Sequence, residues 1–401
     1  MAEGTNFAKL DASRLTRTLN DDPRSLPSPD DLAVRLLEYH TDHIIIASWN
    51  VSNGWSSPIL QPYGPIPIPP AASGLHYATQ SFEGLKLIRG ADGRLRLFRP
   101  IENCERMRRS AAQVALPDFD ALQLEKLIVA LCAHEAPKWL PKDQGEGSLY
   151  IRPTLIGTDT ALATLRPRSA LLYIFLTVFP KLTSSITGHE ASPQKVAAPP
   201  KRCMRLLASD QNQNRSWPGG YGNSKVGANY GPTLALQGEA KSRGYDQILW
   251  LFGPERHITE AGASNFFVVL RVNDTTWQLV TPPLDRGLIL PGITRASVLQ
   301  LARDLLPRAV GGVLRVDVVE REITMREIAK DHADGSIIEA FVSGTALFIT
   351  SVGVICWDGR VFEINSEPVN GVSCSQIIKD ILLDIMKGKV EHEWALLVDE
   401  D

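Results

Sequence analysis

The sequence contains few cysteines, and none of them has the spacing of a metal or redox motif. The five cysteines among 401 residues are scattered, with no C-x-x-C pair and no histidine cluster beside them. Because structural zinc sites and disulfide frameworks need such spacings, the sequence predicts neither, and no metal site of any kind is predicted. Reduced thiols are typical of a cytosolic protein.

Long apolar runs are also missing. The longest, LLYIFLTVF at 171–179, has about half the length that a membrane span needs. The opening stretch MAEGTNFAKLDASRLTRTLNDDP has no apolar core of a secretory signal. Its arginines would suit a mitochondrial transit peptide, but Glu3 and Asp11 would not. We therefore expect a soluble cytoplasmic protein, with mitochondrial import as the less favoured alternative.

An excess of charge of one sign is likewise absent. The chain has 42 basic and 45 acidic residues, well mixed, for a net charge of −3. This balance provides no electrostatic attraction for nucleic acid or an anionic membrane, so neither partner is expected. Repeats at solenoid periods are absent too.

The length exceeds what a single hydrophobic core usually supports, which predicts two domains. Composition suggests an irregular N-terminal arm at 1–40 and a small α+β domain at 41–180. A stretch rich in serine, threonine and proline at 181–200 is the expected linker. Residues 201–401 then form the larger domain.

Hydrophobic periodicity predicts the main elements. A strand at 44–51 precedes a proline-rich stretch at 56–74, where no regular structure is expected. The further predictions for the first half are a hairpin at 85–100, helices at 101–114 and 119–140, and strands at 147–158 and 170–179. Those for the second half are a helix at 233–244 ending at Gly244, strands at 247–252, 264–272 and 277–283, and a helix within 290–306 with Thr294 as its N-cap.

One lysine stands in unusual surroundings. Lys225 lies in GGYGNSKVGANYGP, residues 219–232, among five glycines and almost no opposite charge. A lysine nucleophile must be a free amine, which requires a pKa lowered by burial or by nearby cations. Taken alone, such a lysine is more often a solvated loop residue. The segment also lacks the G-K-[ST] ending of a nucleotide phosphate loop.

Eight separate blocks carry a family resemblance. They are HYATQSFEGLKLIRG, RLFRPIENCERMRRSA, LYIRPTLIGT, SKVGANYGPTLALQGEAKSRGYDQILWLFG, ITEAGASNFFVV, TPPLDRGLILPGITRASVLQLA, FVSGTA and EHEWALLV. In this order they resemble the branched-chain amino acid aminotransferases, which are class IV (fold type IV) pyridoxal-phosphate enzymes. The resemblance covers about residue 41 to the C-terminus.

The resemblance implies both a fold and an activity. The fold is the two-domain α+β architecture of the D-amino acid aminotransferase type, with a smaller N-terminal domain and a larger one built on a β-barrel-like core. The activity is transamination between a hydrophobic L-amino acid and 2-oxoglutarate, with pyridoxal 5′-phosphate (PLP) as cofactor. Small-molecule amino and 2-oxo acids are the implied substrates, and a homodimer is the implied assembly.

The resemblance also assigns the cofactor ring. Lys225 matches the lysine that forms the internal aldimine and then carries a proton between the substrate α-carbon and the cofactor. Tyr230 matches the partner of the phenolic oxygen. Glu260 matches the carboxylate that keeps the pyridine nitrogen protonated, so that the ring withdraws electrons.

The cofactor phosphate has its own implied partners. The backbone amides of Ile293 and Thr294 lie at an expected helix start, where unpaired N–H groups favour an anion. Thr345 matches a hydroxyl donor, and Arg106 matches the family's phosphate arginine. Arg215 is a further candidate for the same phosphate.

For the substrate, the resemblance implies a carboxylate site and an aromatic pocket. Tyr150 and Arg152 match the carboxylate-binding pair, and strand alternation places them on one face. The amides of Thr345 and Ala346 are the other implied carboxylate donors. Tyr77 and Phe82 match pocket aromatics, with Tyr77 reaching across the dimer interface.

Four residues depart from the family pattern, all of them on the substrate side. Leu182 replaces a tyrosine, His40 a phenylalanine, Thr164 an aliphatic residue and Ala263 a threonine. These changes are either neutral variation or a pocket reshaped for a bulkier or more polar acid than leucine. In the second case the enzyme would serve a specialised biosynthetic pathway.

Other activities on this fold stay open from the sequence alone. They are D-amino acid aminotransferase, (R)-amine transaminase and aminodeoxychorismate lyase. The LYIRP block is less typical of these three than of the branched-chain enzymes. A non-catalytic scaffold of the same fold is the alternative from another class. It has no need to retain Lys225, Tyr230, Glu260 and Thr345 together.

Overall fold

The computed structural model describes residues 7–28, 31–142, 147–179, 203–309, 314–346, 348–365 and 367–401. The chain divides into two compact units. Unit 1 comprises Met1–Glu190, Ser224–Ala228 and Asp384–Asp401, and unit 2 comprises Ala191–Asn223 and Asn229–Leu383. The expected linker at 181–200 and Leu182 lie outside the described residues, and the predicted domain boundaries stay predictions.

Unit 1 is built on a ten-stranded sheet, predominantly antiparallel, in the order β1-β4-β2-β9-β8-β6-β7-β19, with β3 paired to β2 and β5 to β8. Its strands are β1 (Thr16–Arg17), β2 (His40–Asn50), β3 (Gly54–Trp55), β4 (Ile59–Pro62), β5 (Gln80–Phe82), β6 (Leu85–Arg89), β7 (Leu95–Phe98), β8 (Ser148–Gly157), β9 (Ser169–Phe179) and β19 (Ala395–Val398). Its helices are η1 (Ala12–Arg14), α1 (Leu32–Arg35), α2 (Ser73–Tyr77), α3 (Pro100–Gln113) and α4 (Ala121–Trp139).

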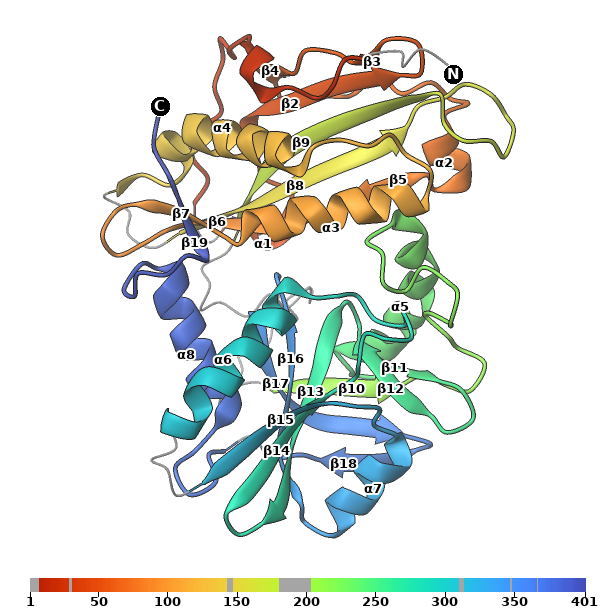
Figure 1. The fold of residues 1–401 in the computed structure, drawn as a ribbon, viewed down its shortest axis with the longest axis vertical. Helices are drawn as coiled ribbons and strands as arrows, with labels where there is room; N and C mark the ends of the chain where they lie inside the picture. Colours follow the sequence, from red (N-terminus) through yellow and green to blue (C-terminus); the bar gives the residue numbers. More distant parts are fainter. Residues whose placement is uncertain are drawn as a thin grey trace, which may run out of the picture. The chain divides into compact units, whose positions relative to one another are not determined.

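Helices α3 and α4 cover one face of this sheet (Figure 1). Leu149, Ile151 and Leu155 alternate along β8 toward the helices and are fully buried there. Tyr150 and Arg152, between them, therefore belong to the other face. This confirms the predicted alternation, and it leaves the second face of the sheet to carry polar and aromatic side chains.

The proline-rich stretch contains more regular structure than expected. Residues Ile59–Pro62 form β4, which pairs with β2 in the register His43 opposite Pro62. Proline is tolerated here because Pro62 lies beyond Ile59 and Leu60, the residues that pair with β1, so that side of the strand is an edge at Pro62. The expected absence of regular structure at 56–74 is therefore wrong for β4, and also for α2 at its end.

Unit 2 is built on a nine-stranded sheet. Its strands are β10 (Met204–Ala208), β11 (Gln247–Phe252), β12 (His257–Ala261), β13 (Ser264–Asn273), β14 (Thr276–Thr281), β15 (Arg315–Glu320), β16 (Ile337–Gly344), β17 (Phe348–Trp357) and β18 (Arg360–Glu363). Its helices are η4 (Gly231–Thr233), α5 (Leu234–Ser242), α6 (Ile293–Ala309) and α7 (Met325–Ala333), while η3 (Gly227–Asn229) and α8 (Cys374–Met386) each span a boundary between the units.

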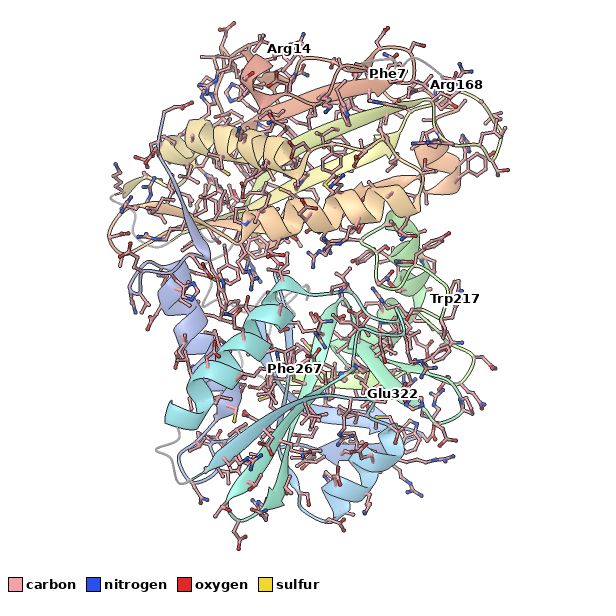
Figure 2. All side chains as sticks on the ribbon, in the orientation of Figure 1. Phe7, Arg14, Arg168, Trp217, Phe267 and Glu322 are labelled. Atoms are coloured by element: carbon pink, nitrogen blue, oxygen red, sulfur yellow. The ribbon has the colours of Figure 1, made fainter. Side chains whose placement is uncertain are left out.

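Six of these strands close into a barrel. The order β12-β11-β10-β17-β16-β13 is completed by a pairing of β12 with β13. Buried apolar residues such as Phe266, Val268 and Val342 form one core cluster. On the alternate side of β13 lies Phe267, which is labelled in Figure 2. Its ring stacks on Phe341 with centroids 4.8 Å apart. The predicted barrel-like core is confirmed.

Helix ends follow the local sequence, with one correction. Thr324 caps α7 by accepting the backbone N–H of Glu327 at 3.1 Å, as in a capping box. Gly244, at φ +81°, follows the end of α5 as predicted. The expected N-cap of α6 is wrong, because the helix begins at Ile293 and Thr294 is already inside it. Gly292 precedes the helix, and its carbonyl accepts the N–H of Ala296.

Within the described residues, no helix combines the length and the apolar character needed to cross a membrane.

Candidate active site

The backbone of Lys225 is fixed within unit 1. Its N–H donates to the hydroxyl of Ser110 on α3 at 2.8 Å, and its carbonyl accepts the N–H of Phe82 at 3.2 Å. Val226 forms an isolated bridge with Ser81 on β5. A Cβ at Gly227 would lie 2.2 Å from Nε2 of Gln80, so a larger residue here would require the Gln80 side chain to move. The glycines beside the lysine thus let the segment pack against a strand.

The amine of Lys225 lies beside an aromatic ring and near an arginine. Its Nζ is 4.9 Å from the centroid of the Phe82 ring, and the guanidinium carbon of Arg152 is 5.0 Å from the same centroid. Arg152 also lies 5.3 Å from the ring of Tyr150. Its Nε is buried and has no hydrogen-bond partner among the described residues. The arrangement offers an amine and an anion-binding cation around one ring.

Tyr150 is held by a glycine and a second aromatic residue. A Cβ at Gly84 would lie 1.8 Å from the tyrosine hydroxyl, so the ring occupies the space that this glycine leaves. On the other side Tyr150 stacks on Phe179 with centroids 5.3 Å apart. Lys86, the cross-strand neighbour of Tyr150, places its Nζ 4.6 Å from the Phe179 ring.

Arg106 is engaged by a carboxylate that the sequence pattern did not single out. Glu83 is fully buried and accepts Nε–H and Nη2–H of Arg106 at 2.6 and 2.9 Å. Asn103, one turn earlier on α3, donates to the same carboxylate at 2.8 Å. Burial raises the pKa of Glu83, but Arg106, together with Lys225 and Asn103, lowers it below its usual value. The carboxylate therefore stays ionised and orients the arginine.

Glu260 is the centre of a buried polar group in unit 2. Its Oε2 lies 2.5 Å from Nη1 of Arg215, and both side chains are almost fully buried. Its Oε1 accepts the side-chain amide of Asn265 and the backbone N–H of Leu290, both at 3.2 Å. The structure thus places Arg215, expected at a phosphate, beside Glu260. Asn265 was missed because its partners are set by the β12–β13 turn and a distant loop.

The start of α6 and the end of β16 are connected to this group through Asn265. Its amide also donates to the carbonyl of Leu290, and a Cβ at Gly292 would lie 2.0 Å from its Oδ1. The first N–H groups of a helix lack partners within that helix, so Ile293 and Thr294 present donors just beyond Gly292. Ser343, paired with Asn265 across β13 and β16, has a buried hydroxyl without a hydrogen-bond partner in the described part of the chain.

The other predicted residues lie in turns, in loops and at helix ends. Thr345 and Ala346 lie in the turn after β16. The ideal Cβ of Gly344, the last residue of β16, would be 3.9 Å from the carbonyl of Ala263. In unit 2, Tyr230 directly precedes η4. In unit 1, Tyr77 at the end of α2 and Thr164 in the 158–168 loop are both exposed.

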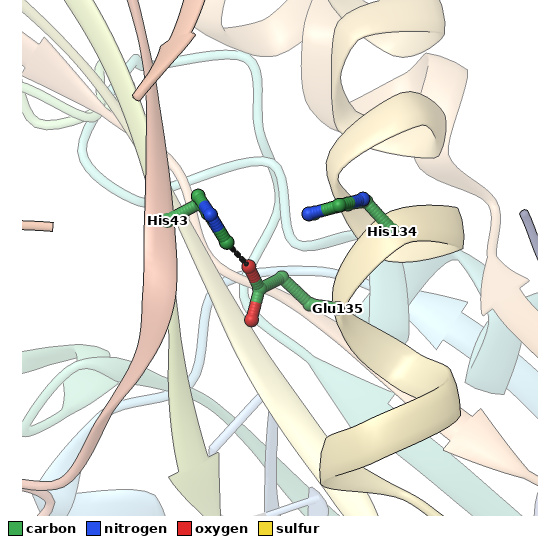
Figure 3. A group of neighbouring side chains, drawn as sticks. All are labelled: His43, His134 and Glu135. Carbon is green, nitrogen blue, oxygen red and sulfur yellow. Dashed lines mark hydrogen bonds and ion pairs between the residues drawn. The ribbon is translucent and has the colours of Figure 1, made fainter. Parts of the chain in front are cut away.

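A second polar cluster in unit 1 has the composition of a metal site. It contains His43 on β2 with His134 and Glu135 on α4 (Figure 3). Nδ1 of His43 lies 2.5 Å from Glu135 Oε1, and its Nε2 accepts the N–H of Asn20 at 2.9 Å. Ligand atoms around a tetrahedral zinc ion, with bonds of about 2.0–2.1 Å, are more than ~3 Å apart. Nδ1 of His43 and Oε1 of Glu135 are therefore too close to be two ligands of one zinc ion.

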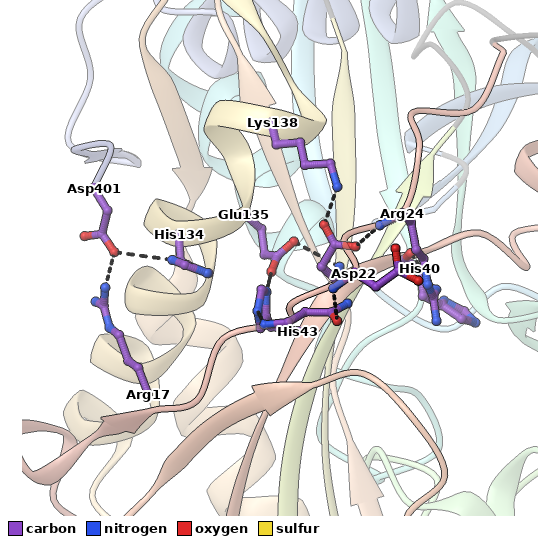
Figure 4. Close-up of polar contacts among 11 residues, drawn as sticks. Arg17, Asp22, Arg24, His40, His43, His134, Glu135, Lys138 and Asp401 are labelled. Atoms are coloured by element: carbon purple, nitrogen blue, oxygen red, sulfur yellow. Dashed lines mark hydrogen bonds and ion pairs between the residues drawn. The ribbon is translucent and has the colours of Figure 1, made fainter.

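The same cluster is better described as a structural network. The second oxygen of Glu135 accepts the backbone N–H of Asp42 at 3.1 Å, and Lys138 pairs with the Asp42 carboxylate. Figure 4 labels His43, Glu135 and Lys138 among the polar contacts of this region. Both ring nitrogens of His43 and both oxygens of Glu135 therefore have partners. The cluster ties the N-terminal segment and β2 to α4, which is a role in packing and not in chemistry.

Three comparisons with known proteins extend these observations. The family model for class IV amino-transferases matches residues 80–355. The mitochondrial branched-chain-amino-acid aminotransferases of Bos taurus and Saccharomyces cerevisiae are each 40% identical to this chain. The alignments cover 96% and 98% of this chain, and 92% and 94% of those proteins. The cytosolic enzyme of Mus musculus is 39% identical over 92% of this chain and 89% of its own.

Solved structures give the same fold. A branched-chain aminotransferase from Thermoproteus uzoniensis, determined with norvaline, superposes with a TM-score of 0.65 at 24% identity, covering 88% of this chain and 99% of that one. The PLP-form enzyme from Thermobaculum terrenum gives 0.64 at 21% identity, with coverages of 89% and 98%. The predicted fold type IV architecture is confirmed. The chain belongs to the class IV aminotransferases.

Proposed function

We propose that this protein transfers the amino group between a branched-chain or related hydrophobic L-amino acid and 2-oxoglutarate. Lys225 is the residue that holds PLP covalently. The observation that carries the proposal is the position of the Lys225 amine and the Arg152 guanidinium around the one ring of Phe82. An amine that moves a proton at the substrate α-carbon needs a nearby cation to hold the substrate carboxylate.

The donors and acceptors on the chain fit PLP. Glu260, buried and ionically paired with Arg215, is a carboxylate suited to the pyridine nitrogen. The first amides of α6, the hydroxyl of Thr345 and the oriented guanidinium of Arg106 are suited to a phosphate dianion. The ring hydroxyl of Tyr230 is assigned to the phenolic oxygen. Bound PLP supplies an electron sink for the negative charge that develops when the α-proton leaves.

The chain's own residues would then carry the reaction. With PLP bound, the Lys225 amine would accept the α-proton as a general base and, as a general acid, deliver it to the carbon on the other side of the substrate nitrogen. Arg152, with the Tyr150 ring beside it, would hold the carboxylate so that the α-proton faces the amine. The Thr345 and Ala346 amides are assigned as further carboxylate donors. The apolar rings of Phe82 and Phe179 exclude water from this face.

Reduction with borohydride tests the role of Lys225. Sodium borohydride is added to the purified protein, which is then digested and mapped for the pyridoxyl group. We expect the label on the peptide that contains Lys225, and a Lys225→Ala variant that folds but has lost transamination by at least about a thousandfold. A label on another lysine, or an active variant, would contradict the assignment.

A second candidate is an enzyme of the same class with a reshaped pocket, acting on an unusual amino acid in a specialised pathway. One observation favours it: His40 hydrogen-bonds to Thr177, which lies in register with Tyr150, so both share the sheet face of the proposed carboxylate site. A panel of amino donors decides between the two. If leucine, isoleucine and valine react faster than every other donor, the second candidate fails.

Assembly and compartment are further parts of the proposal. A homodimer is expected, with Tyr77 contributing to the pocket of the partner subunit. The relatives include both mitochondrial and cytosolic enzymes. Of these we propose the cytoplasm, as the sequence predicts.

A further inference from the structure

A row of polar side chains crosses the face of the unit 1 sheet opposite helices α3 and α4. His40 on β2 pairs in register with Thr177 on β9, Thr177 with Tyr150 on β8, and Tyr150 with Lys86 on β6. Residues directly opposite on neighbouring strands share a face. This face is the one that also carries Arg152, since Tyr150 and Arg152 are two residues apart on β8.

His40 and Thr177 form the end of this row. Nδ1 of His40 and Oγ1 of Thr177 are 2.9 Å apart, which is a hydrogen bond. The imidazole also packs against the rings of Tyr63 at 4.9 Å and Phe175 at 5.3 Å. Along β9, Thr177 lies between Phe175 and Phe179 on one face of the strand, where the neighbouring side chains are aromatic. The hydroxyl and the imidazole thus introduce hydrogen-bonding groups into aromatic surroundings.

The second ring nitrogen of His40 is available to a ligand. Nε2 has no hydrogen-bond partner among the described residues, and the side chain is only half-buried. Burial and the nearby guanidinium of Arg24 lower the pKa of His40, so the ring is neutral near pH 7. A neutral imidazole can offer Nε2–H to an oxygen while Nδ1 is engaged with the hydroxyl.

The charges around the row favour an oxygen ligand. Arg24 lies over the Tyr63 ring at 5.0 Å, Lys86 over Phe179 and Arg152 over Tyr150. Three cations therefore contact the rings that border the row. A side chain that ends in a carbonyl or hydroxyl oxygen would gain from this potential, whereas an aliphatic side chain would leave the polar groups unmatched.

We propose that His40 and Thr177 form a polar subsite of the substrate pocket and favour substrates whose side chain ends in an oxygen acceptor. The inference rests on the proposed function, because it assumes that Arg152 holds the substrate carboxylate on this face. Relative to an apolar isostere, such a substrate gains one hydrogen bond at the end of its side chain.

Matched donors of equal shape test the subsite. Asparagine is compared with leucine, and glutamine with homoleucine, in the half-reaction with the PLP-loaded enzyme, followed by the loss of its visible absorption band. In each pair the polar-to-apolar ratio of kcat/KM is measured for wild type, His40→Phe and Thr177→Val. We expect the ratio to fall about five- to tenfold in both variants, since each removes a hydrogen-bonding group with little change in shape. Thr177→Ser, which keeps the hydroxyl, should retain the wild-type ratio.

His332→Phe is the control. His332 on α7 makes a similar edge contact with Phe362 at 5.4 Å but belongs to unit 2 and to no proposed substrate contact, so its ratio should equal that of wild type. Circular dichroism and the temperature of thermal unfolding show that each variant is folded. Equal ratios in wild type, His40→Phe and Thr177→Val, with leucine still reacting, would overturn the subsite alone. A wild-type enzyme that reacts with no donor would instead overturn the proposed function.

Discussion

Gly84 determines where the Tyr150 ring can lie. The ideal Cβ at this position falls 1.8 Å from the tyrosine hydroxyl, a clash that only a shift of the rigid ring can relieve. We predict that Gly84→Ala folds but raises KM for the amino acid and for 2-oxoglutarate about tenfold, with kcat less affected. The reason is that the Tyr150 ring supports binding of the substrate carboxylate. Steady-state kinetics measure this. Gly238→Ala on α5, where no atom lies within 4 Å, is the control and should leave KM unchanged.

Lys86 provides a test by pH. Burial lowers its pKa from 10.5 to about 8. The unfolded chain therefore binds more protons than the folded one between pH 8 and 10.5, and stability rises with pH in this window. Lys86→Met removes this dependence. We predict that the stability of the variant relative to wild type, measured by urea denaturation, decreases by on the order of 3 kcal/mol from pH 7 to pH 10.5. Lys126→Met, at an exposed position, should show no such change; an equally flat result for Lys86→Met would contradict the burial argument.

The position of a single residue can be predicted from the sequence where it depends only on its neighbours along the chain. The common face of Tyr150 and Arg152 follows from strand alternation alone. The pairing of Arg106 with Glu83 joins α3 to the end of β5, so it depends on packing that no local pattern encodes. The only local sign of this pairing is that Asn103 and Arg106, which both donate to Glu83, lie one turn apart on α3. The same limit applies to His40 and Thr177, which are 137 residues apart.

Elements were predicted well where periodicity is strong. The hairpin of β6 and β7, helices α3 and α4, and strands β8 and β9 all occur where the apolar pattern places them. Strand β4 was missed, because prolines surround this short segment and its pairing is supplied by two partners distant in sequence, β1 and β2. The closure of the barrel by β12 and β13 depends on a register that only the folded sheet determines.

The packing of strand β2 on helix α4 can be tested by its contribution to stability. Glu135 accepts from both His43 and Asp42, and it is almost fully buried. Removing the carboxylate leaves two buried donors without a partner, so Glu135→Ala should lower the free energy of unfolding by about 2–4 kcal/mol. Urea denaturation measures the loss. Lys126→Ala on the exposed side of the same helix is the control, and an equal effect from both would show that the network contributes nothing.

We propose that the whole molecule is a dimer, with three exposed leucines of unit 1 as candidates for the contact. Leu75, Leu162 and Leu165 are 58%, 70% and 66% exposed, unusually high for large apolar side chains that are close in the fold. Helix α2 and the 158–168 loop are joined by a hydrogen bond from Ser73 N–H to the carbonyl of Asp159. Covering these leucines by a second copy would remove apolar surface from water.

Charge at these positions should therefore weaken the dimer. We predict that wild type sediments as a dimer, and that the double variant Leu162→Glu and Leu165→Glu shifts toward monomer in sedimentation velocity, because two carboxylates would be buried without partners. Leu122→Glu, at a 52% exposed leucine on α4, should remain dimeric. If the double variant loses activity together with the dimer while still folded, the active site requires both copies, as expected for a tyrosine at position 77 that completes the partner's pocket. A wild-type monomer with full activity would contradict this assembly.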